Sequence, residues 1–86
     1  MRKVVFEVEA FRDFVEWASI DRRLYQRIAN LIVDTLRTPF SGLGKPEPLK
    51  YTFKGCWSRR IDDKNRVIYK VSADEILIIA CKGHYD

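Results

Sequence analysis

All three prolines of this 86-residue chain, and two of its four glycines, lie within residues 38–48, and this stretch divides the chain into two unlike halves. Proline lacks a backbone N–H and pushes the preceding residue toward extended geometry, while glycine tolerates turns. We therefore predict an ordered loop without regular structure at residues 38–48. The chain has the length of one domain and shows no internal repeat, so we expect residues 1–86 to form a single domain.

The half before this loop predicts one strand followed by two helices. Lys3–Val8 is rich in β-branched and aromatic residues, which is typical of a strand. Apolar residues at helical spacing predict a first helix over residues 10–18, and Asp21 is a suitable N-cap for a longer second helix. The apolar face of that second helix consists of Leu24, Ile28, Leu31, Ile32 and Leu36. Because only a few residues join the two helices, we expect them to pack as an antiparallel hairpin.

The half after the loop predicts an antiparallel meander of four strands, at residues 49–53, 56–62, 66–72 and 75–83. Ile76–Ala80 is apolar at every position, so both faces of the last strand should be covered and this strand should be central. The predicted fold class is therefore α+β: a two-helix hairpin packed on one face of a twisted, mainly antiparallel five-stranded sheet. The other face of the sheet should stay partly open.

The short apolar runs and the few cysteines argue against a membrane or secreted protein. The longest apolar run, Ile76–Cys81, is far shorter than the roughly 18 residues that span a bilayer. Met1–Phe6 begins like a signal peptide, but Glu7 and Glu9 interrupt the apolar segment. Two cysteines are too few for a secreted disulfide scaffold, so we expect a soluble, cytoplasmic protein with both thiols reduced.

Positive charge is concentrated in one part of the chain, although the net charge is only +4. Residues 1–43 are nearly balanced, whereas residues 45–60 set five basic residues against Glu47 alone. Three aromatic residues are interleaved with the basic ones, a pattern typical of a nucleic-acid-binding face. We therefore predict phosphate contacts from Lys45, Lys50 and Lys54. Charge alone leaves open a basic surface that only maintains solubility.

Glu47, Arg66 and His84 are the residues whose chemistry suggests catalysis. His84 is the single histidine of the sequence, and an imidazole exchanges protons near neutral pH. Glu47 stands between two prolines, which hold its backbone stiffly. Arg66 begins a predicted strand whose hairpin partner carries Arg59 and Arg60, and strand alternation sends these two to opposite faces. Either of them could therefore join Arg66 on the open face.

These residue types are sufficient for metal-independent cleavage of RNA. A carboxylate can take the proton from a ribose 2′-hydroxyl, which then attacks phosphorus, while an imidazolium donates a proton to the departing 5′-oxygen. A guanidinium binds phosphate bidentately and stabilises charge on the phosphorane. We expect neither a metal nor another cofactor, because Cys81 and His84 supply only half of a zinc site. The residues alone also allow a solvated turn at Glu47, a packing histidine, and surface ion pairs of the arginines with Asp62 and Asp63.

Five short blocks of the sequence follow one another along the chain. They are Thr38-Pro39-Phe40, Gly44-Lys45-Pro46-Glu47-Pro48-Leu49-Lys50, Trp57-Ser58-Arg59-Arg60-Ile61, Asn65-Arg66-Val67-Ile68-Tyr69 and Cys81-x-x-His84-Tyr85. In this order, and in a chain of this length, the blocks resemble the YoeB/Txe branch of the RelE/ParE toxin superfamily. The resemblance covers essentially the whole chain in register. It implies a fold like that of microbial ribonucleases and the toxin role in a type II toxin–antitoxin system.

The resemblance also implies an activity and partners. The activity is that of an endoribonuclease, an mRNA interferase that cleaves messenger RNA in the A site of the 70S ribosome and so inhibits translation. Neutralisation by a YefM/Phd-like antitoxin is implied as well, and homodimers are common in this branch, which favours a homodimer. Carried over by position, Glu47 corresponds to the general base, His84 to the general acid and Arg66 to the phosphate-stabilising residue.

Three further positions match the family pattern. Lys50 and Arg60 match residues that support the site and bind the RNA backbone, which favours Arg60 over Arg59. Tyr85 matches a terminal tyrosine that helps to organise the substrate. Gly83 departs from the pattern and could loosen the C-terminal segment. Two other functions stay open: a non-catalytic module that docks on the ribosome or the antitoxin, and a gyrase poison, although relatives of that kind generally lack the Glu/Arg/His set.

Overall fold

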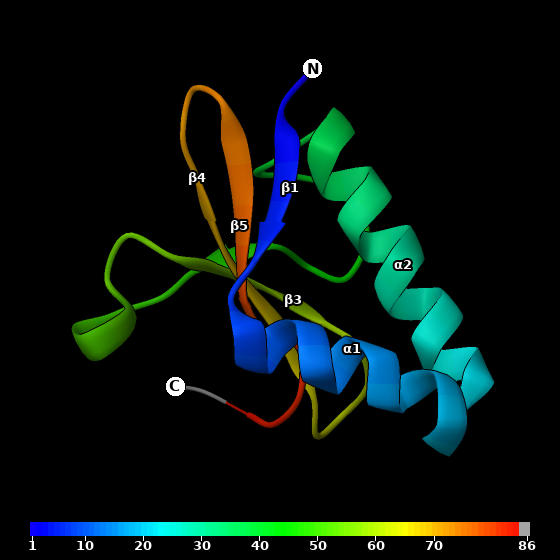
Figure 1. Ribbon diagram of the computed structural model, residues 1–86. Helices are drawn as coiled ribbons and strands as arrows, with labels where there is room; N and C mark the ends of the chain where they lie inside the picture. The colour runs from blue at the N-terminus through cyan, green and yellow to red at the C-terminus, as the bar shows by residue number, and fades with distance from the viewer. Residues whose placement is uncertain (85–86) are drawn as a thin grey trace.

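Over residues 1–84, which the structure describes, the computed structural model contains a five-stranded sheet with two helices packed against it (Figure 1). The helices are α1 (Val8–Ile20) and α2 (Arg22–Arg37). The strands are β1 (Lys3–Phe6), β2 (Glu47–Pro48), β3 (Trp57–Arg60), β4 (Arg66–Val71) and β5 (Glu75–Ala80), and a short 3-10 helix, η1, spans Tyr51–Phe53. The predicted α+β class is confirmed.

The strand order is β1-β5-β4-β3-β2, so β5 is central, as its apolar sequence predicted. β5 pairs in parallel with β1 and antiparallel with β4, and the pairs β4–β3 and β3–β2 are antiparallel. Ile76 and Ile78 of β5 are fully buried in the core beneath the helices. Leu77, which alternates to the opposite face, is only half-buried, so that face is partly open.

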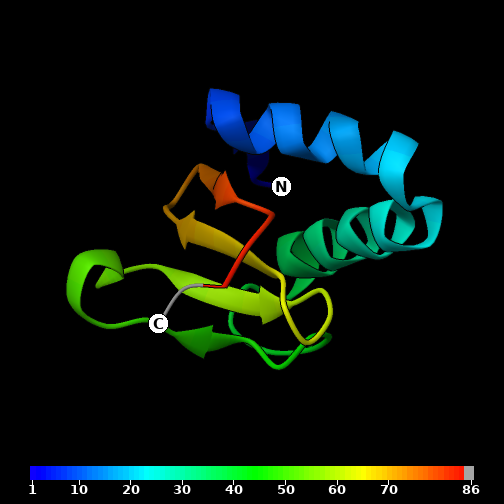
Figure 2. The same ribbon diagram turned by 90° about the horizontal axis from the view of Figure 1, so that it is seen from below.

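Asp21 separates the two helices and caps the second, as predicted. Its carboxylate accepts a hydrogen bond from the backbone N–H of Leu24 at 3.1 Å, which satisfies one of the donors that a helix start leaves unpaired. α1 begins at Val8, earlier than predicted, and no side chain caps it. From Asp21 the helices diverge as a V-shaped hairpin (Figure 2), inside which Phe14 stacks on Tyr25 with ring centroids 4.9 Å apart.

A cluster of apolar side chains between the helices and the sheet forms the core. Its members are Ala10, Trp17, Ile28, Leu31, Ile32, Ile61, Val67, Tyr69, Ile76, Ile78 and Cys81. Full burial of each large aliphatic side chain stabilises the fold by about 1.5–3 kcal/mol. The Trp17 indole N–H donates to the carbonyl of Cys81 at 2.9 Å, which ties α1 to the end of β5. Cys56 and Cys81 are free and buried, and burial raises the pKa of the Cys81 thiol to about 12.

The prediction of a strand at residues 49–53 is wrong. The strand before β3 is instead β2, and the chain then turns into η1. Tyr51 adopts a φ of 57°, in the left-handed region, which a regular strand does not contain. Leu49 closes the turn by donating its N–H to the carbonyl of Cys56 at 2.9 Å. The return of the chain to β3 therefore overrides the strand propensity of this segment.

Several other elements end earlier than predicted. β1 ends at Phe6 because α1 begins at Val8, and β3 ends at Arg60. β5 ends at Ala80, and Gly83, with a φ of 92°, turns the chain soon afterwards. Among the described residues, neither helix is both long and apolar enough to cross a bilayer.

Candidate active site

A cleft of about 360 Å³ lies on the open face of the sheet, beside β2 and β3. Its lining includes the three residues predicted to be catalytic, Glu47, Arg66 and His84. Two of the residues predicted to bind RNA, Lys50 and Arg60, also line it. The other lining residues are Pro48, Leu49, Tyr51 and Ser58. Side chains that lie far apart in the sequence therefore meet at one place.

The register of the strands explains why these side chains meet. Glu47 in β2 lies opposite Ser58 in β3, and Arg60, farther along β3, lies opposite Arg66 in β4. Residues opposite each other in antiparallel strands project to the same face, and so do residues two apart on one strand. The sheet therefore presents a carboxylate and two guanidinium groups on one face.

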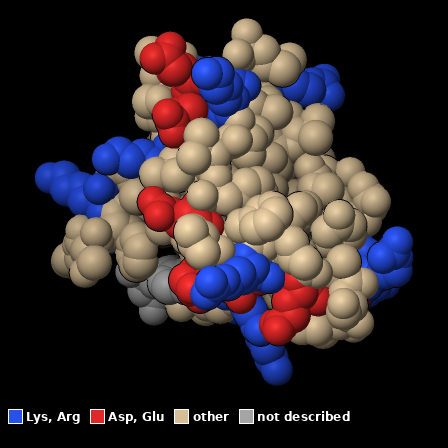
Figure 3. All heavy atoms as spheres, in the orientation of Figure 1, with Lys and Arg blue, Asp and Glu red and all other residues tan. Residues whose placement is uncertain are grey.

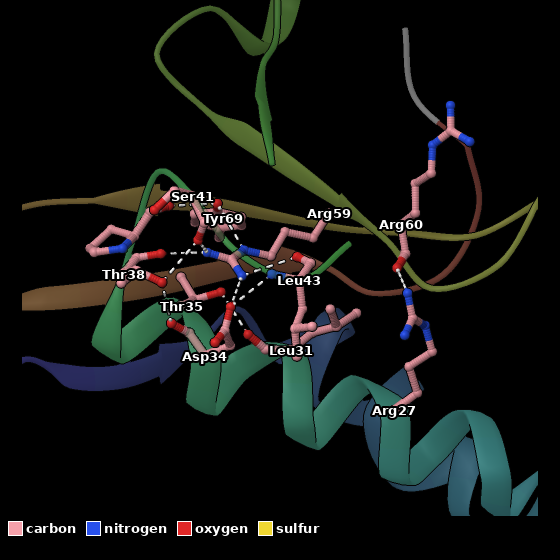
Figure 4. Close-up of polar contacts among 11 residues, drawn as sticks. Arg27, Leu31, Asp34, Thr35, Thr38, Ser41, Leu43, Arg59, Arg60 and Tyr69 are labelled. Atoms are coloured by element: carbon pink, nitrogen blue, oxygen red, sulfur yellow. Dashed lines mark hydrogen bonds and ion pairs between the residues drawn. The ribbon is translucent and has the colours of Figure 1, made fainter. Parts of the chain in front are cut away.

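Arg59 and Arg60 are neighbours with opposite environments (Figure 4). Arg59 is fully buried and points toward α2, whereas Arg60 is exposed and projects away from α2. Of the two, Arg60 joins Arg66 in the cleft, as the family resemblance favoured. The ion pair of Arg59 is with Asp34 of α2 and not with the acidic residues of the β3–β4 turn.

The buried guanidinium of Arg59 holds the proline-rich loop against the sheet. Its hydrogen-bond acceptors are the carboxylate of Asp34 at 2.7 Å, the hydroxyl of Tyr69 at 3.2 Å, and the carbonyls of Thr38, Ser41 and Leu43 at 2.6, 2.9 and 3.1 Å. The N–H of Arg60 adds a bond of 2.7 Å to the carbonyl of Gly44. Because this loop leads into Glu47, the network helps to place the carboxylate in the cleft.

The pKa of Asp34 reflects this network. A hydrogen bond from the backbone N–H of Leu43, followed in importance by the bond from Arg59, holds the pKa of Asp34 below the ordinary value of 3.8. The carboxylate is therefore ionised at neutral pH and balances the buried guanidinium. Burial raises the pKa of Tyr69, so its hydroxyl stays protonated and donates to the carbonyl of Pro39 at 2.7 Å.

The turn between β3 and β4 positions Arg66. This side chain is mostly buried, and its Nη1 donates to the carbonyls of Asp62 at 2.6 Å and Asn65 at 3.0 Å. The Asp62 carboxylate accepts from the backbone N–H groups of Lys64 and Asn65 at 2.8 and 2.7 Å. Burial opposes ionisation of Asp62, yet these hydrogen bonds and the nearby Arg66 hold its pKa below 3.8. Arg66 therefore enters the cleft from a turn that several hydrogen bonds stabilise.

His84 reaches the cleft because the chain after β5 crosses the sheet. In Figure 2 this red segment leaves β5 and runs toward β3 and β2. Gly83, which precedes His84, donates its N–H to the side-chain oxygen of Asn65 and accepts from the N–H of Arg66, each at 2.9 Å. Both the N–H and the carbonyl of Gly83 are therefore hydrogen-bonded, whereas the sequence suggested that this glycine loosens the C-terminal segment. Its φ of 92° lies in the region that glycine adopts most readily.

Two of the predicted binding residues lie outside the cleft lining. Lys45 and Lys54 are exposed but are not part of the cleft lining, so their contacts with RNA stay a prediction. Figure 3 shows basic side chains gathered beside the loop between η1 and β3, at the left of the view. Tyr85 lies outside the described residues.

Ser58 and Tyr51 line the cleft but were not predicted to do so. Ser58 is buried opposite Glu47 and stands two residues before Arg60. Strand alternation could have identified it, because it must share a face with Arg60. Tyr51 could not have been identified in this way, since the turn that places it was predicted as a strand.

The cleft combines groups that suit a phosphodiester substrate. The guanidinium groups of Arg60 and Arg66 and the ammonium of Lys50 provide positive charge and hydrogen-bond donors for phosphate oxygens. Glu47 and His84 are groups that can accept or donate a proton at the same cleft. Within residues 1–84, no three His, Cys, Asp or Glu side chains are grouped as a metal ion would need.

Comparison with known proteins identifies the family. Residues 6–85 match the family model of a YoeB-like toxin of bacterial type II toxin–antitoxin system. This chain belongs to the YoeB toxin family. Toxin YoeB of Escherichia coli K12 is 47% identical over 83 residues, which are 96% of this chain and 99% of that protein. Toxin RelK of Mycobacterium tuberculosis is 46% identical over 85 residues, 99% of this chain and all of that protein.

Solved structures of YoeB proteins share the whole fold. A YoeB/ParE toxin from Agrobacterium tumefaciens has a TM-score of 0.92 at 42% identity, over 96% of this chain and 99% of that one. YoeB from Staphylococcus aureus has been solved as a dimer, with a TM-score of 0.91 at 34% identity over 98% of both chains. The complex of that YoeB with YefM gives a TM-score of 0.89 at 32% identity over 99% of both chains. The chain is therefore a toxin of the type II toxin–antitoxin class.

Proposed function

We propose that this chain is a ribosome-dependent endoribonuclease that cleaves messenger RNA in the ribosomal A site without a metal cofactor. The observation that carries the proposal is that Glu47, Arg66 and His84 line one cleft, together with Lys50 and Arg60. Membership in a toxin family supports an activity that damages an essential process, and cleavage of messages during translation is such an activity.

The reaction proceeds by attack of the ribose 2′-hydroxyl on the adjacent phosphorus. Glu47 takes the hydroxyl proton, and His84 in its protonated form donates a proton to the departing 5′-oxygen. Arg66 and Arg60 bind the non-bridging oxygens, on which negative charge builds in the phosphorane. The products are a 2′,3′-cyclic phosphate, or the 3′-phosphate formed from it, and a 5′-hydroxyl.

Substrate binding draws on the positive charge around the cleft. Lys45, Lys50 and Lys54 make sequence-independent contacts with phosphates of the message or of ribosomal RNA, so binding weakens as salt is added. Tyr85, the residue after His84, helps to organise the substrate. The net charge of the protein is only +4. The ribosome therefore aligns the message in the open cleft.

A YefM-like antitoxin is the proposed inhibitor, and a homodimer is the proposed form of the free toxin. Both rest on the Staphylococcus aureus YoeB, which has been solved with YefM and as a dimer. An acidic segment of the antitoxin would fit a cleft that presents Arg60 and Arg66, because carboxylates can occupy the phosphate positions.

Two substitutions test the chemical roles. Glu47→Gln and His84→Gln should each slow cleavage of a ribosome-bound message by about 10²–10⁴-fold while ribosome binding persists. Glu9→Gln, at an exposed position of α1, is the matched control and should cleave at the normal rate. If Glu47→Gln and His84→Gln cleave as fast as the control, the cleft is not a ribonuclease site.

The absence of a metal from the chemical step needs a separate test, because ribosomes themselves require Mg²⁺. Sulfur in place of a non-bridging oxygen of the scissile phosphate weakens binding of Mg²⁺ but not of softer metal ions such as Mn²⁺. The proposal predicts that Mn²⁺ does not restore the rate lost on sulfur substitution. Restoration by Mn²⁺ would point to a metal at the phosphate.

A further inference from the structure

Asn65, in the turn between β3 and β4, links the carboxylate of Asp62 to the backbone of Gly83. Its Nδ2 donates to the two carboxylate oxygens of Asp62 at 3.1 and 3.3 Å, and its Oδ1 accepts from the Gly83 N–H at 2.9 Å. A carboxylate only accepts and a backbone N–H only donates, so these two partners determine which way the Asn65 amide faces. The side chain is therefore an oriented bridge.

Gly83 is held at both of its peptide planes. Its N–H, in the peptide bond with Lys82, is bonded to Asn65, and its carbonyl, in the peptide bond with His84, accepts from the Arg66 N–H at 2.9 Å. Because each peptide group is planar, these two contacts determine the path of the backbone as far as the Cα of His84.

The same turn holds the phosphate-binding group. Nη1 of Arg66 donates to the carbonyls of Asp62 and Asn65, and the backbone N–H of Arg66 holds Gly83. The turn between β3 and β4 thus holds both the guanidinium of Arg66 and the backbone before His84 through hydrogen bonds. A shift of the turn would move both groups, whereas loss of the Asn65 side chain would remove only one of the two contacts that hold the backbone before His84.

We propose that Asn65 is a positioning residue for His84, which it holds in the cleft that Glu47 and Arg66 also line. The inference rests on the proposed ribonuclease function and deepens it, because it names a residue outside the cleft on which catalysis depends. Asn65 is not part of the cleft lining and acts through Gly83. A catalytic group displaced by about 1 Å can lose about 10²-fold in rate.

The first test removes the bridge. Asn65→Ala should lower kcat for cleavage of a ribosome-bound message by roughly 10–100-fold and leave KM unchanged. Asp63→Asn, an exposed carboxylate of the same turn, is the matched control and should keep the normal kcat. An Asn65→Ala protein with normal kcat, measured beside an inactive His84→Gln protein, would overturn the inference.

The second test exchanges the two side chains of the bridge. Asn65→Asp keeps an acceptor for the Gly83 N–H but sets a second carboxylate against Asp62, so kcat should fall. In the double variant Asp62→Asn/Asn65→Asp, the new amide at position 62 can donate to the new carboxylate at position 65, which still accepts from Gly83. The double variant should recover kcat toward the normal value. A double variant no more active than Asn65→Asp would contradict an oriented bridge.

A third measurement reads the position of His84 without any cleavage. In folded Asn65→Ala, hydrogen exchange at the Gly83 N–H should be faster and the NMR signals of the His84 imidazole should shift, while the melting temperature confirms folding. If the normal protein does not cleave messages, the proposed function fails and this measurement alone decides the role of Asn65. Unchanged Gly83 exchange and unchanged His84 signals would overturn the inference.

Discussion

Arg60 and Arg66 lie directly opposite each other across the β3–β4 ladder, so one cross-strand pair carries two positive charges. Like charges at opposite positions destabilise a sheet, and Arg66 is in addition mostly buried. An anion bound between the two guanidinium groups would relieve this repulsion. We therefore propose that the pair binds a phosphate of the substrate or a carboxylate of an inhibitor, and that its repulsion lowers the stability of the free protein.

Replacing Arg60 by alanine should weaken RNA binding without weakening the fold. The free energy of unfolding should stay the same or rise by up to about 1 kcal/mol, because a repulsive pair is removed. The affinity for the ribosome should fall. The slope of log affinity against log salt concentration should decrease by about the amount that one phosphate contact contributes. Urea denaturation and cosedimentation at several salt concentrations measure the two effects. Arg23→Ala, an equal charge change in the first turn of α2, should leave the salt dependence as it was.

The neighbouring Arg59 should behave in the opposite way. Arg59→Ala would leave the carboxylate of Asp34 and the carbonyls of the proline-rich loop without their donor, and removal of one partner from a buried ion pair costs about 3–5 kcal/mol. This is a large part of the stability of a small domain. Thermal unfolding should therefore occur at a much lower temperature. A loss below about 1 kcal/mol would show that the network contributes little.

Asp34 and Asp62 should make the fold sensitive to acid. The folded pKa of each lies below the ordinary value of 3.8, so the unfolded chain takes up protons first as the pH falls. Their stabilisation is fully present above the unfolded pKa of about 4 and is lost as the pH falls through the folded pKa. Asp34→Asn should be less stable at pH 7 and should show a shallower loss of stability in acid. Parallel stability curves for the two proteins would contradict this role of Asp34.

A YefM-like antitoxin should release the contacts of Gly83 when it covers the cleft. Its carboxylates would pair with Arg60 and Arg66, and we expect His84 to be displaced from the site. Hydrogen exchange at the Gly83 N–H should therefore be faster in the complex than in the free toxin. Unchanged exchange at Gly83, together with a nuclease activity that persists in the complex, would show that the antitoxin acts elsewhere.

The parts of the fold with local signals could be predicted from the sequence. Asp21 caps α2 because its side chain needs only the next turn of the same helix, and Ile76–Ala80 is central because every residue is apolar. The segment at residues 49–53 could not be predicted, because Tyr51 takes its positive φ from the return of the chain to β3. Local strand propensity carries no information about how the chain must turn to return to β3.

The sequence suggested which residues could form a candidate site, but it did not show how the fold brings them into one cleft. Strand alternation separated Arg59 from Arg60, but only the contact with Asp34 on α2 shows which of them is buried. The contact between Asn65 and Gly83 joins residues 18 positions apart and depends on the path of the chain after β5. No local sequence pattern therefore predicts it. Such long-range contacts determine the position of His84.

Attack by the 2′-hydroxyl next to the scissile phosphate is the central claim, and a single atom in the message tests it. Ribosomes would be loaded with a message that carries one 2′-deoxynucleotide at the cleavage position, and compared with ribosomes that carry the all-ribose message. The account predicts that the ribose message yields a 2′,3′-cyclic or 3′-phosphate and a 5′-hydroxyl, and that the deoxy position is not cut. Cleavage at the deoxy position at a similar rate, or a product with a 5′-phosphate, would contradict it.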